Sequence, residues 1–397
     1  MAAGRPRLHR SSAAPGVLPL PRAAGAQGSG IDLSREPADG ADDASNAASS
    51  HPAAADGGRR PLIDRRLALR TASLVAPARR AEPARISALR ADVRAELPVI
   101  DAAARGFTDL GRDLPETTVS VVGRTAWVRA NLDVIAGAFE PLRERLEQRA
   151  TASRRVLGLQ LGGLLGLLST KVLGQFVLPL AGAGTGQLLV VGPNVLELAD
   201  EHGRVADDIR RTVVLHEITH RLQFDANPWL GDHLRGLVER YLQHTRIDGN
   251  QFAELLPRLP SAIAAAKESG EVKPLLETVL TEEQVEVIDE AQGLMSLLEG
   301  HGNATMYGAT DALVEDAEGV REALASRQGD VASKVLNAVA GLELKRRQYR
   351  EGEVFVRHVL DHAGTAGLNQ AFAAPEHLPR SAEITDPDAW LERVSGT

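Results

Sequence analysis

Apolar residues recur at helical spacing along most of this 397-residue chain from Pro61 onward, and this periodicity constrains the fold more than any other feature. Segments such as PLIDRRLALRTASLV and EPARISALRADVRAELPVIDAAA place apolar side chains on one helical face and arginines on the other. The best strand candidate is LLVVGPNVLEL, around Leu188 to Leu196, which follows a glycine-rich turn. The sequence therefore predicts a mainly α-helical protein with a small β element.

The first 60 residues differ from the rest of the chain, because they are rich in Ala, Gly, Ser, Asp and Pro and contain few large apolar side chains. This composition predicts a disordered, low-complexity tail over residues 1–60 and a helix-rich domain over residues 61–397. Candidate sub-boundaries lie near residues 183 and 226. The apolar stretch GVLPLP is too short and proline-broken for a secretory signal, so a cytoplasmic protein is expected.

A long apolar segment, Val156–Gly182, requires a test against the membrane. Its longest uncharged run, Val156–Thr170, is shorter than the ~20 residues that a membrane-spanning helix needs. Glycines at positions 158, 162 and 166 would allow close packing against another helix. We therefore expect a fully buried helix in a globular core and no membrane span.

Charge and cysteine content exclude several classes of function. The formal net charge is −8, whereas a nucleic-acid-binding protein is expected to carry a basic patch. No glycine-rich phosphate loop of the Walker or dinucleotide type is present. The chain has no cysteine, so a transition metal would have to be held by His, Asp or Glu.

The stretch TVVLHEITHRLQF contains the arrangement with the clearest chemistry. On a helix, His216 and His220 lie one turn apart on the same face, so both imidazoles can reach one ion. Glu217 lies about 100° around the helix and is placed to act as general base toward a water on that ion. This pattern predicts a zinc site of the HExxH type, on a helix whose first turn is favoured by Asp207 and Asp208.

Two histidines leave the ligand set incomplete, because a hydrolytic zinc site has three protein ligands and one open position. The closely spaced alternative would need a histidine at position 226, where the chain has Ala226. Glu299, in LMSLLEGHGN, is the preferred third ligand, on a helix expected to run from the N-cap Thr281 to about Gly300. Other candidates for this role are Glu290, His301, His233 and His244.

Several further segments resemble one known family. HEITHRLQFDANPWLGDHL, LLEGHGN, STKVLGQFVLPL and LELKRRQYREGEVFVRHVLDHAG are similar to segments of an actinobacterial zincin-like metallopeptidase family. One branch of that family is described as associated with coenzyme F420 biosynthesis. The resemblance covers roughly Pro61 to Val394, and the segments LLEGH and KRRQYREG are far more specific to the family than the HExxH element.

The resemblance implies a zincin-like metallopeptidase fold with the active-site helix beside an edge strand. It assigns His216, His220 and Glu299 as zinc ligands and Glu217 as the catalytic base. The expected activity is zinc-dependent cleavage of amide bonds in an unidentified peptide or protein. Alternatives are a catalytically silent, zinc-stabilised scaffold and a small-amide hydrolase linked to F420 metabolism.

Two further expectations concern the reaction. Candidate donors to the transition state are His301 and Tyr307, and also Tyr241 and His244. The strand around Leu188 to Leu196 is expected to pair with an extended peptide substrate. No pattern in the chain predicts an oligomeric state.

Overall fold

A computed structural model describes residues 61–76, 81–140, 151–178, 186–244, 281–309, 313–326 and 342–396, apart from the side chains of residues 151–153 and 342–350. Residues 60–397 form one compact unit. The tail predicted over residues 1–60 lies outside the described residues.

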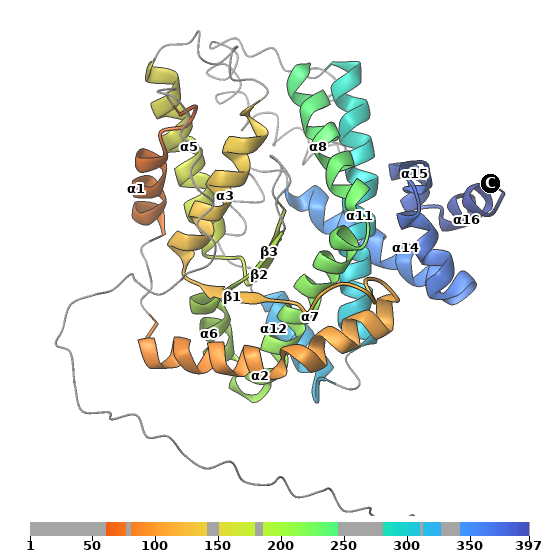
Figure 1. Ribbon diagram of the computed structural model, residues 1–397, viewed down its shortest axis with the longest axis horizontal. Helices are drawn as coiled ribbons and strands as arrows, with labels where there is room; N and C mark the ends of the chain where they lie inside the picture. Colours follow the sequence, from red (N-terminus) through yellow and green to blue (C-terminus); the bar gives the residue numbers. More distant parts are fainter. Residues whose placement is uncertain are drawn as a thin grey trace, which may run out of the picture. The chain divides into compact units, whose positions relative to one another are not determined.

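Helices dominate the described part of the chain (Figure 1). They are α1 (Arg65–Val75), α2 (Pro83–Thr108), α3 (Arg124–Ala138), α5 (Thr151–Ser169), α6 (Gly192–Glu201), α7 (Ala206–Asp225), α8 (Pro228–Gln243), α11 (Glu282–Gly308), α12 (Ala317–Ser326), α14 (Leu342–Asn369), α15 (Ser381–Ile384) and α16 (Pro387–Ser395). The strands are β1 (Val119–Val122), β2 (Gly174–Val177) and β3 (Gln187–Val191). The prediction of a mainly α-helical fold with a small β element is confirmed.

The three strands form one small sheet in the order β1-β3-β2. β1 runs parallel to β3, with Val121 opposite Val190, and β2 runs antiparallel to β3, with Phe176 opposite Leu188. Because β3 is the central strand, both of its edges are already paired. The prediction that the strand around Leu188 to Leu196 would receive a peptide is therefore wrong, and the edge strand beside the HExxH helix is β2.

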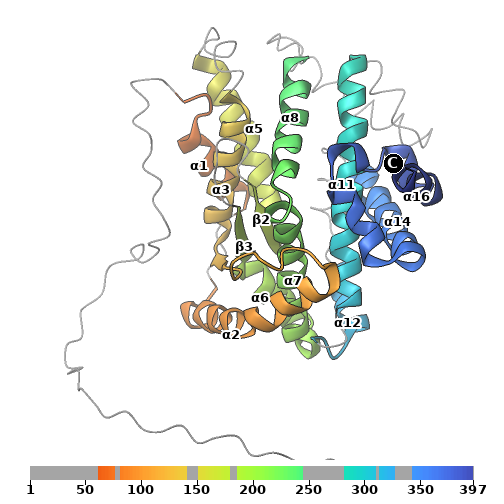
Figure 2. The same cartoon turned by 45° about the vertical axis from the view of Figure 1, so that its right-hand side comes forward.

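β3 joins two hydrophobic cores, which explains its uninterrupted apolar sequence. Leu188 and Val190 belong to the larger core, together with residues of α2, α7, α11 and α14. Leu189 and Val191 point to the opposite face and pack with residues of α1, α3 and α5. Figure 2 shows the sheet between these two groups of helices, with α8 and α11 side by side.

The predicted strand is too long, because α6 begins at Gly192. Pro193 lies in the first turn of that helix, where its missing N–H costs no intrahelical hydrogen bond. The predicted helix over Val156–Gly182 is also too long. α5 ends at Ser169, and β2 follows at Gly174, where hydrogen bonding to β3 replaces the helical pattern.

The glycines of α5 allow close contact with α1, as the sequence suggested. A Cβ atom at Gly158 would lie 2.8 Å from the Asp64 carbonyl oxygen, and one at Gly166 would lie 2.8 Å from the Ala72 Cα atom. α5 is not fully buried, however, because Val156 is 50% exposed and Leu159 is 47% exposed. Among the described helices, none is long and apolar enough to span a membrane.

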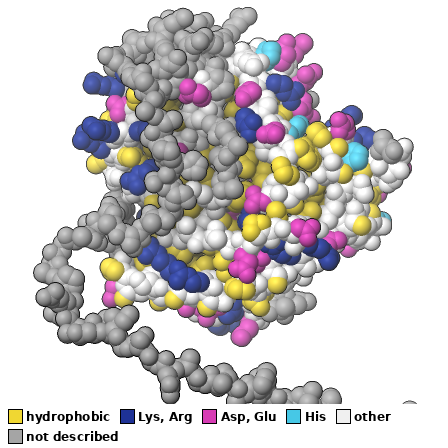
Figure 3. All heavy atoms as spheres, viewed as in Figure 1, with side chains coloured by type: hydrophobic (Ala, Val, Ile, Leu, Met, Phe, Trp, Pro, Cys, Tyr) yellow, Lys and Arg dark blue, Asp and Glu magenta, His cyan; other side chains and the backbone are white. Residues whose placement is uncertain are grey.

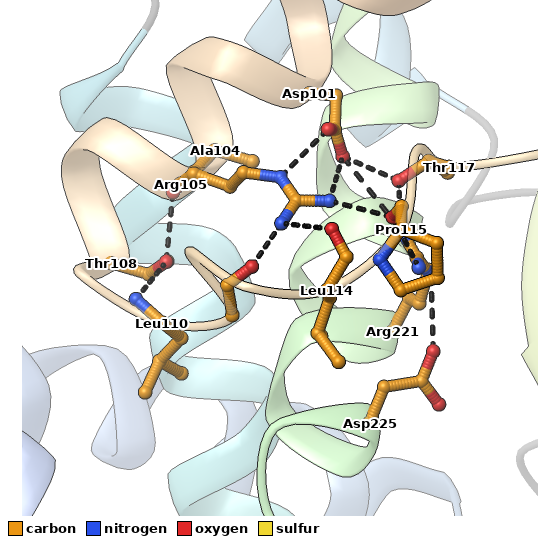
Figure 4. Close-up of polar contacts among 11 residues, drawn as sticks. Asp101, Ala104, Arg105, Thr108, Leu110, Leu114, Pro115, Thr117, Arg221 and Asp225 are labelled. Carbon is orange, nitrogen blue, oxygen red and sulfur yellow. Dashed lines mark hydrogen bonds and ion pairs between the residues drawn. The ribbon is translucent and has the colours of Figure 1, made fainter.

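Two polar clusters fix α7, one against α2 and the other against the segment between α2 and β1. Near the start of α7, Arg210 and Arg211 both donate to the carboxylate of Glu96, at 2.9 and 3.0 Å. Near its end, Arg221 donates to the Pro115 carbonyl oxygen at 2.9 Å and also to the Thr117 hydroxyl group (Figure 4). The helix that carries the HExxH residues is thus held at both ends.

Charged side chains of both signs are interspersed over the face seen in Figure 3. No extended basic surface is visible among the described residues of that face. This distribution agrees with the excess of acidic over basic residues in the sequence.

Candidate metal centre

The central part of α7 is buried on most of its circumference, and the two histidines occupy one of its partly open faces. Buried residues of this part of the helix include Val214, Leu215, Ile218 and Leu222. His216 and His220 lie one turn apart, with ring centroids 4.5 Å apart and their Nε2 atoms 3.0 Å apart. The predicted spacing therefore places both Nε2 atoms close enough to bind one ion.

Glu299 reaches the same point from α11. Its Oε2 atom lies 3.5 Å from the His216 Nε2 atom and 3.7 Å from the His220 Nε2 atom. α11 begins at the predicted capping box of Thr281 and Gln284 but continues to Gly308, beyond the predicted end near Gly300. Glu299 therefore lies inside the helix, and its position on the inward face is fixed by the helical geometry.

The geometry of this donor set fits zinc. A tetrahedral ion with ligands at ~2.1 Å would hold its donor atoms roughly 3.4 Å apart. The three separations of 3.0, 3.5 and 3.7 Å bracket that value. The three side chains are 14–19% exposed, so the cluster remains accessible to water or to a substrate group at a fourth position.

Electrostatics favour an anionic Glu299 between the imidazoles. Burial raises the pKa of the Glu299 carboxyl, but the adjacent His216 and His220 outweigh burial and hold this pKa well below its usual range. Burial lowers the pKa of His220, but its contact with Glu299 outweighs burial and raises the pKa to about 9. A divalent cation would replace the proton on His220 as the partner of this carboxylate.

Glu217 lies beside the cluster, on the side of the sheet. Its Oε2 atom accepts a hydrogen bond of 2.7 Å from the backbone N–H of Phe176 in β2. Burial raises the pKa of Glu217 above its ordinary value, against the opposing effects of His216, His220 and this hydrogen bond. Gly174 makes room for the carboxylate, since a Cβ atom there would lie 2.6 Å from the Glu217 Cγ atom.

β2 directs its outer backbone edge toward Glu217. The Leu173 carbonyl oxygen, just before the strand, accepts from the Val191 N–H of β3 at 2.8 Å, whereas the Phe176 N–H points to Glu217 instead. Because backbone groups alternate along an antiparallel strand, Gly174 and Phe176 direct theirs away from β3. β2 is an outer strand of the sheet among the described residues.

The two predicted donors, His301 and Tyr307, both lie on α11. His301 is fully buried behind His220, and burial, aided by the charge on His220, lowers its pKa to about 3. Tyr307 lies two turns beyond Glu299 on α11, about 12 Å along the axis, with the Arg321 guanidinium 4.5 Å from its ring centroid.

The other candidate ligands make separate contacts. Glu290 forms an ion pair with Arg240 of α8, and His233 packs edge-on against Trp229, with ring centroids 6.0 Å apart. His244 lies 3.9 Å from Glu283, at the opposite end of α11 from Glu299. Tyr241 is half-buried on α8.

Sequence analysis did not identify four residues that support the site, namely Gly174, Phe176, Gln223 and Gly302. A Cβ atom at Gly302 would lie 2.7 Å from the His216 Cε1 atom. Only Gln223 carries a sequence signal, because it lies three residues after His220 and therefore on a neighbouring part of the helix.

Comparison with known proteins shows the family of the chain. The sequence model of the zincin-like metallopeptidase family matches residues 63–391. The chain belongs to this family. Membership of this family implies a metal, usually zinc, and among the described residues His216, His220 and Glu299 form a group that could hold such an ion.

The chain is also similar to a solved structure, a crystal structure of a proposed hydrolase with a novel fold from Chloroflexus aurantiacus. The two chains share 28% sequence identity with a TM-score of 0.63, over 84% of this chain and 99% of the other. No curated protein matches the sequence.

Proposed function

We propose that this zincin-like protein is a zinc-dependent metallopeptidase that cleaves amide bonds in a peptide or protein. The observation that carries the proposal is the convergence of His216, His220 and Glu299 beside the buried carboxylate of Glu217. Membership of the zincin-like family and the similarity to a proposed hydrolase support hydrolysis as the reaction class.

Each residue has a separate role in this proposal. His216, His220 and Glu299 hold the metal. When bound, zinc lowers the pKa of a coordinated water and polarises a substrate carbonyl group. Glu217 takes the proton from the attacking water and delivers it to the nitrogen of the leaving amine. The raised pKa of Glu217 suits this carboxylate to hold a proton between the two steps.

The outer edge of β2 favours an extended peptide as the substrate. Gly174 and Phe176 direct backbone groups away from β3, on the side where Glu217 lies. An extended chain can add to such an edge through main-chain hydrogen bonds. These bonds would place a scissile amide next to Glu217 without requiring a particular side chain at every position.

A second substrate class follows from the resemblance to the F420-associated branch, which suggests a small amide. The strand edge favours the peptide, because an extended chain, unlike a small amide, can form main-chain hydrogen bonds along β2. A non-catalytic zinc scaffold is the third alternative, and it predicts the same metal without turnover.

The test replaces Glu217 by Gln and measures zinc content together with cleavage of a broad peptide library. We expect stoichiometric zinc in both proteins and a loss of cleavage rate of about 10²- to 10⁴-fold in Glu217→Gln, because the general base is removed. Glu290→Gln is the matched control, since Glu290 is a carboxylate on an ion pair remote from the cluster.

Unchanged cleavage by Glu217→Gln would contradict the proposed mechanism. Wild-type protein that binds zinc but cleaves no peptide would favour the scaffold. Cleavage of small amides without cleavage of peptides would favour the second substrate class.

A further inference from the structure

Gln223 links the two helices that carry the proposed ligands. Its side chain is fully buried, and its carboxamide lies between His220 on its own helix and residues of α11. The Oε1 atom lies 2.9 Å from the His220 Nδ1 atom. The Nε2 atom lies 3.0 Å from the Leu298 carbonyl oxygen and 3.3 Å from the His301 Nδ1 atom.

The Leu298 carbonyl group determines which way this amide points. A carbonyl oxygen can only accept a hydrogen bond, so the NH₂ group of Gln223 must face Leu298. The Gln223 oxygen atom is then left facing His220, and it can only accept. The Nδ1 atom of His220 must therefore carry a proton. An imidazole protonated on Nδ1 has its lone pair available on Nε2, the atom that lies beside His216 and Glu299.

The same amide also ties Glu299 to this arrangement. Leu298 directly precedes Glu299, so the hydrogen bond from Gln223 fixes the turn of α11 from which the Glu299 carboxylate projects. His301 receives the second N–H of Gln223 on its Nδ1 atom, within the same buried region. One side chain thus sets the orientation of His220 and the distance between α7 and α11.

We propose that Gln223 is a positioning residue of the metal centre: it fixes His220 with Nε2 free to bind metal, and it fixes α11 next to Glu299. The inference rests on the proposed function, because it takes His216, His220 and Glu299 as the ligands. It assigns His301 a supporting role as an acceptor for Gln223 rather than a role in the reaction.

The first test measures zinc affinity by competition with a chromogenic chelator. Gln223→Met keeps the side-chain volume but removes both the acceptor for His220 and the donor for Leu298. We expect a loss of zinc affinity of about 10- to 100-fold, as is found when an outer partner of a ligating histidine is removed. Gln223→Glu keeps an acceptor for His220 but loses the donor for Leu298, and we expect its zinc affinity to lie between those of Gln223→Met and the wild type.

Asn194→Leu is the matched control. Asn194 is another fully buried amide, on α6, which donates to the Ser169 and Val172 carbonyl oxygens and accepts from Arg124. We expect this variant to lower the free energy of unfolding but to leave zinc affinity unchanged. Zinc binding by Gln223→Met that is as tight as that of the wild type would overturn the proposal.

A second measurement does not depend on the folding of any variant. The ¹⁵N imidazole spectrum of the zinc-loaded wild-type protein should show His220 bound through Nε2, with an Nδ1 proton that exchanges slowly with water. Coordination through Nδ1 would overturn the role of Gln223. A wild-type protein that binds no zinc would instead refute the proposed function, whereas zinc binding without peptide cleavage would leave the role of Gln223 intact.

Discussion

Two glycines make the space in which the side chains of the site are held. Gly174 faces the Glu217 carboxylate and Gly302 faces the His216 ring, and neither position has room for a methyl group. Replacing each glycine by alanine therefore perturbs one function of the site at a time, the base in the first case and the metal ligand in the second.

Gly174→Ala is expected to lower the rate of peptide cleavage while zinc affinity stays at the wild-type value. The added Cβ atom would lie 2.6 Å from the Glu217 Cγ atom and 3.1 Å from its Oε1 atom, so the carboxylate must move. Displacements of this size cost up to about 100-fold in rate. The control is Gly123→Ala, because a Cβ atom at Gly123 has no neighbour within 4 Å. Cleavage that is unaffected by Gly174→Ala would contradict the position given to the base.

Gly302→Ala is expected to weaken zinc binding by about tenfold. Alanine normally stabilises a helix interior by roughly 0.5–1 kcal/mol relative to glycine, but here its methyl group would displace His216. The control is Gly236→Ala on α8, where a Cβ atom has no neighbour within 4 Å. This variant should raise the free energy of unfolding without a change in zinc affinity. Chelator competition and chemical unfolding, performed on both variants, separate the two effects. A zinc affinity equal to wild type in Gly302→Ala would show that His216 is not held against Gly302.

Among single residues, the sequence predicted those that share one helix at a recognisable spacing, but it did not reveal those that act through packing. The intervals from His216 to Glu217 and His220 have meaning within one helix, so they are visible in the sequence. Gly174 and Gly302 matter because of what lies opposite them on another element. That pairing depends on the tertiary structure.

The contact between α1 and α5 gives the sharpest test at the level of an element. Gly162 and Gly163 are adjacent on α5, but a Cβ atom at Gly162 would collide with the Ala68 carbonyl oxygen, whereas one at Gly163 meets nothing within 4 Å. Gly162→Ala is expected to destabilise the protein by roughly 1–3 kcal/mol. Gly163→Ala should be neutral or stabilise it by up to about 1 kcal/mol. Chemical unfolding measures both, and equal effects at the two positions would contradict the close backbone contact.

Element boundaries were harder to predict than element types. The start of α8 at Pro228 and the capping box of α11 follow from local chemistry, and the structure has both. The apolar run from Val156 contains α5 and then β2, because the chain after Ser169 hydrogen bonds to β3, a partner that periodicity cannot reveal. The part of the predicted strand after Val191 became α6 for the same reason, since the sheet ends there.

For the whole molecule, zinc is expected to stabilise the fold as well as to serve the reaction. The ligands come from α7 and α11, so bound metal joins two helices that are separated by a long stretch of sequence. Free zinc at 100 times its Kd should add about 2.7 kcal/mol to the free energy of unfolding. Scanning calorimetry with zinc and with chelator should give a higher Tm with zinc for the wild type and equal values for His220→Ala. A wild-type Tm that does not respond to zinc would argue against a native site.

Acid should weaken the anchoring of the C-terminal helices. Burial raises the pKa of Glu383, but hydrogen bonds from Arg393 and from the Arg380 N–H outweigh it and lower this pKa. Because the pKa of Glu383 is lower in the folded protein than in the unfolded chain, where it is near 4.5, the ionised carboxylate stabilises the fold above that pH. This stabilisation is lost as the pH falls through the pKa of the folded protein. Glu383→Gln should therefore lower the free energy of unfolding by roughly 1–3 kcal/mol at pH 7 and by much less at pH 3.5.

Urea unfolding at the two pH values measures this difference, with the exposed Glu392→Gln on α16 as the control. If Glu383→Gln lowers the free energy of unfolding equally at both pH values, the assigned direction of the pKa shift is wrong.

The backbone contact between Gly300 and Gly352 has a consequence for the order of events during synthesis. Gly300 follows Glu299 directly, and a Cβ atom at Gly300 would collide with the Gly352 carbonyl oxygen of α14. The turn that presents Glu299 is therefore supported by a segment made about 50 residues later. A ribosome-bound chain that ends before Gly352 contains His216, His220 and Glu299 but lacks this support. Completion of the proposed metal centre is therefore expected to follow the emergence of α14 from the ribosome.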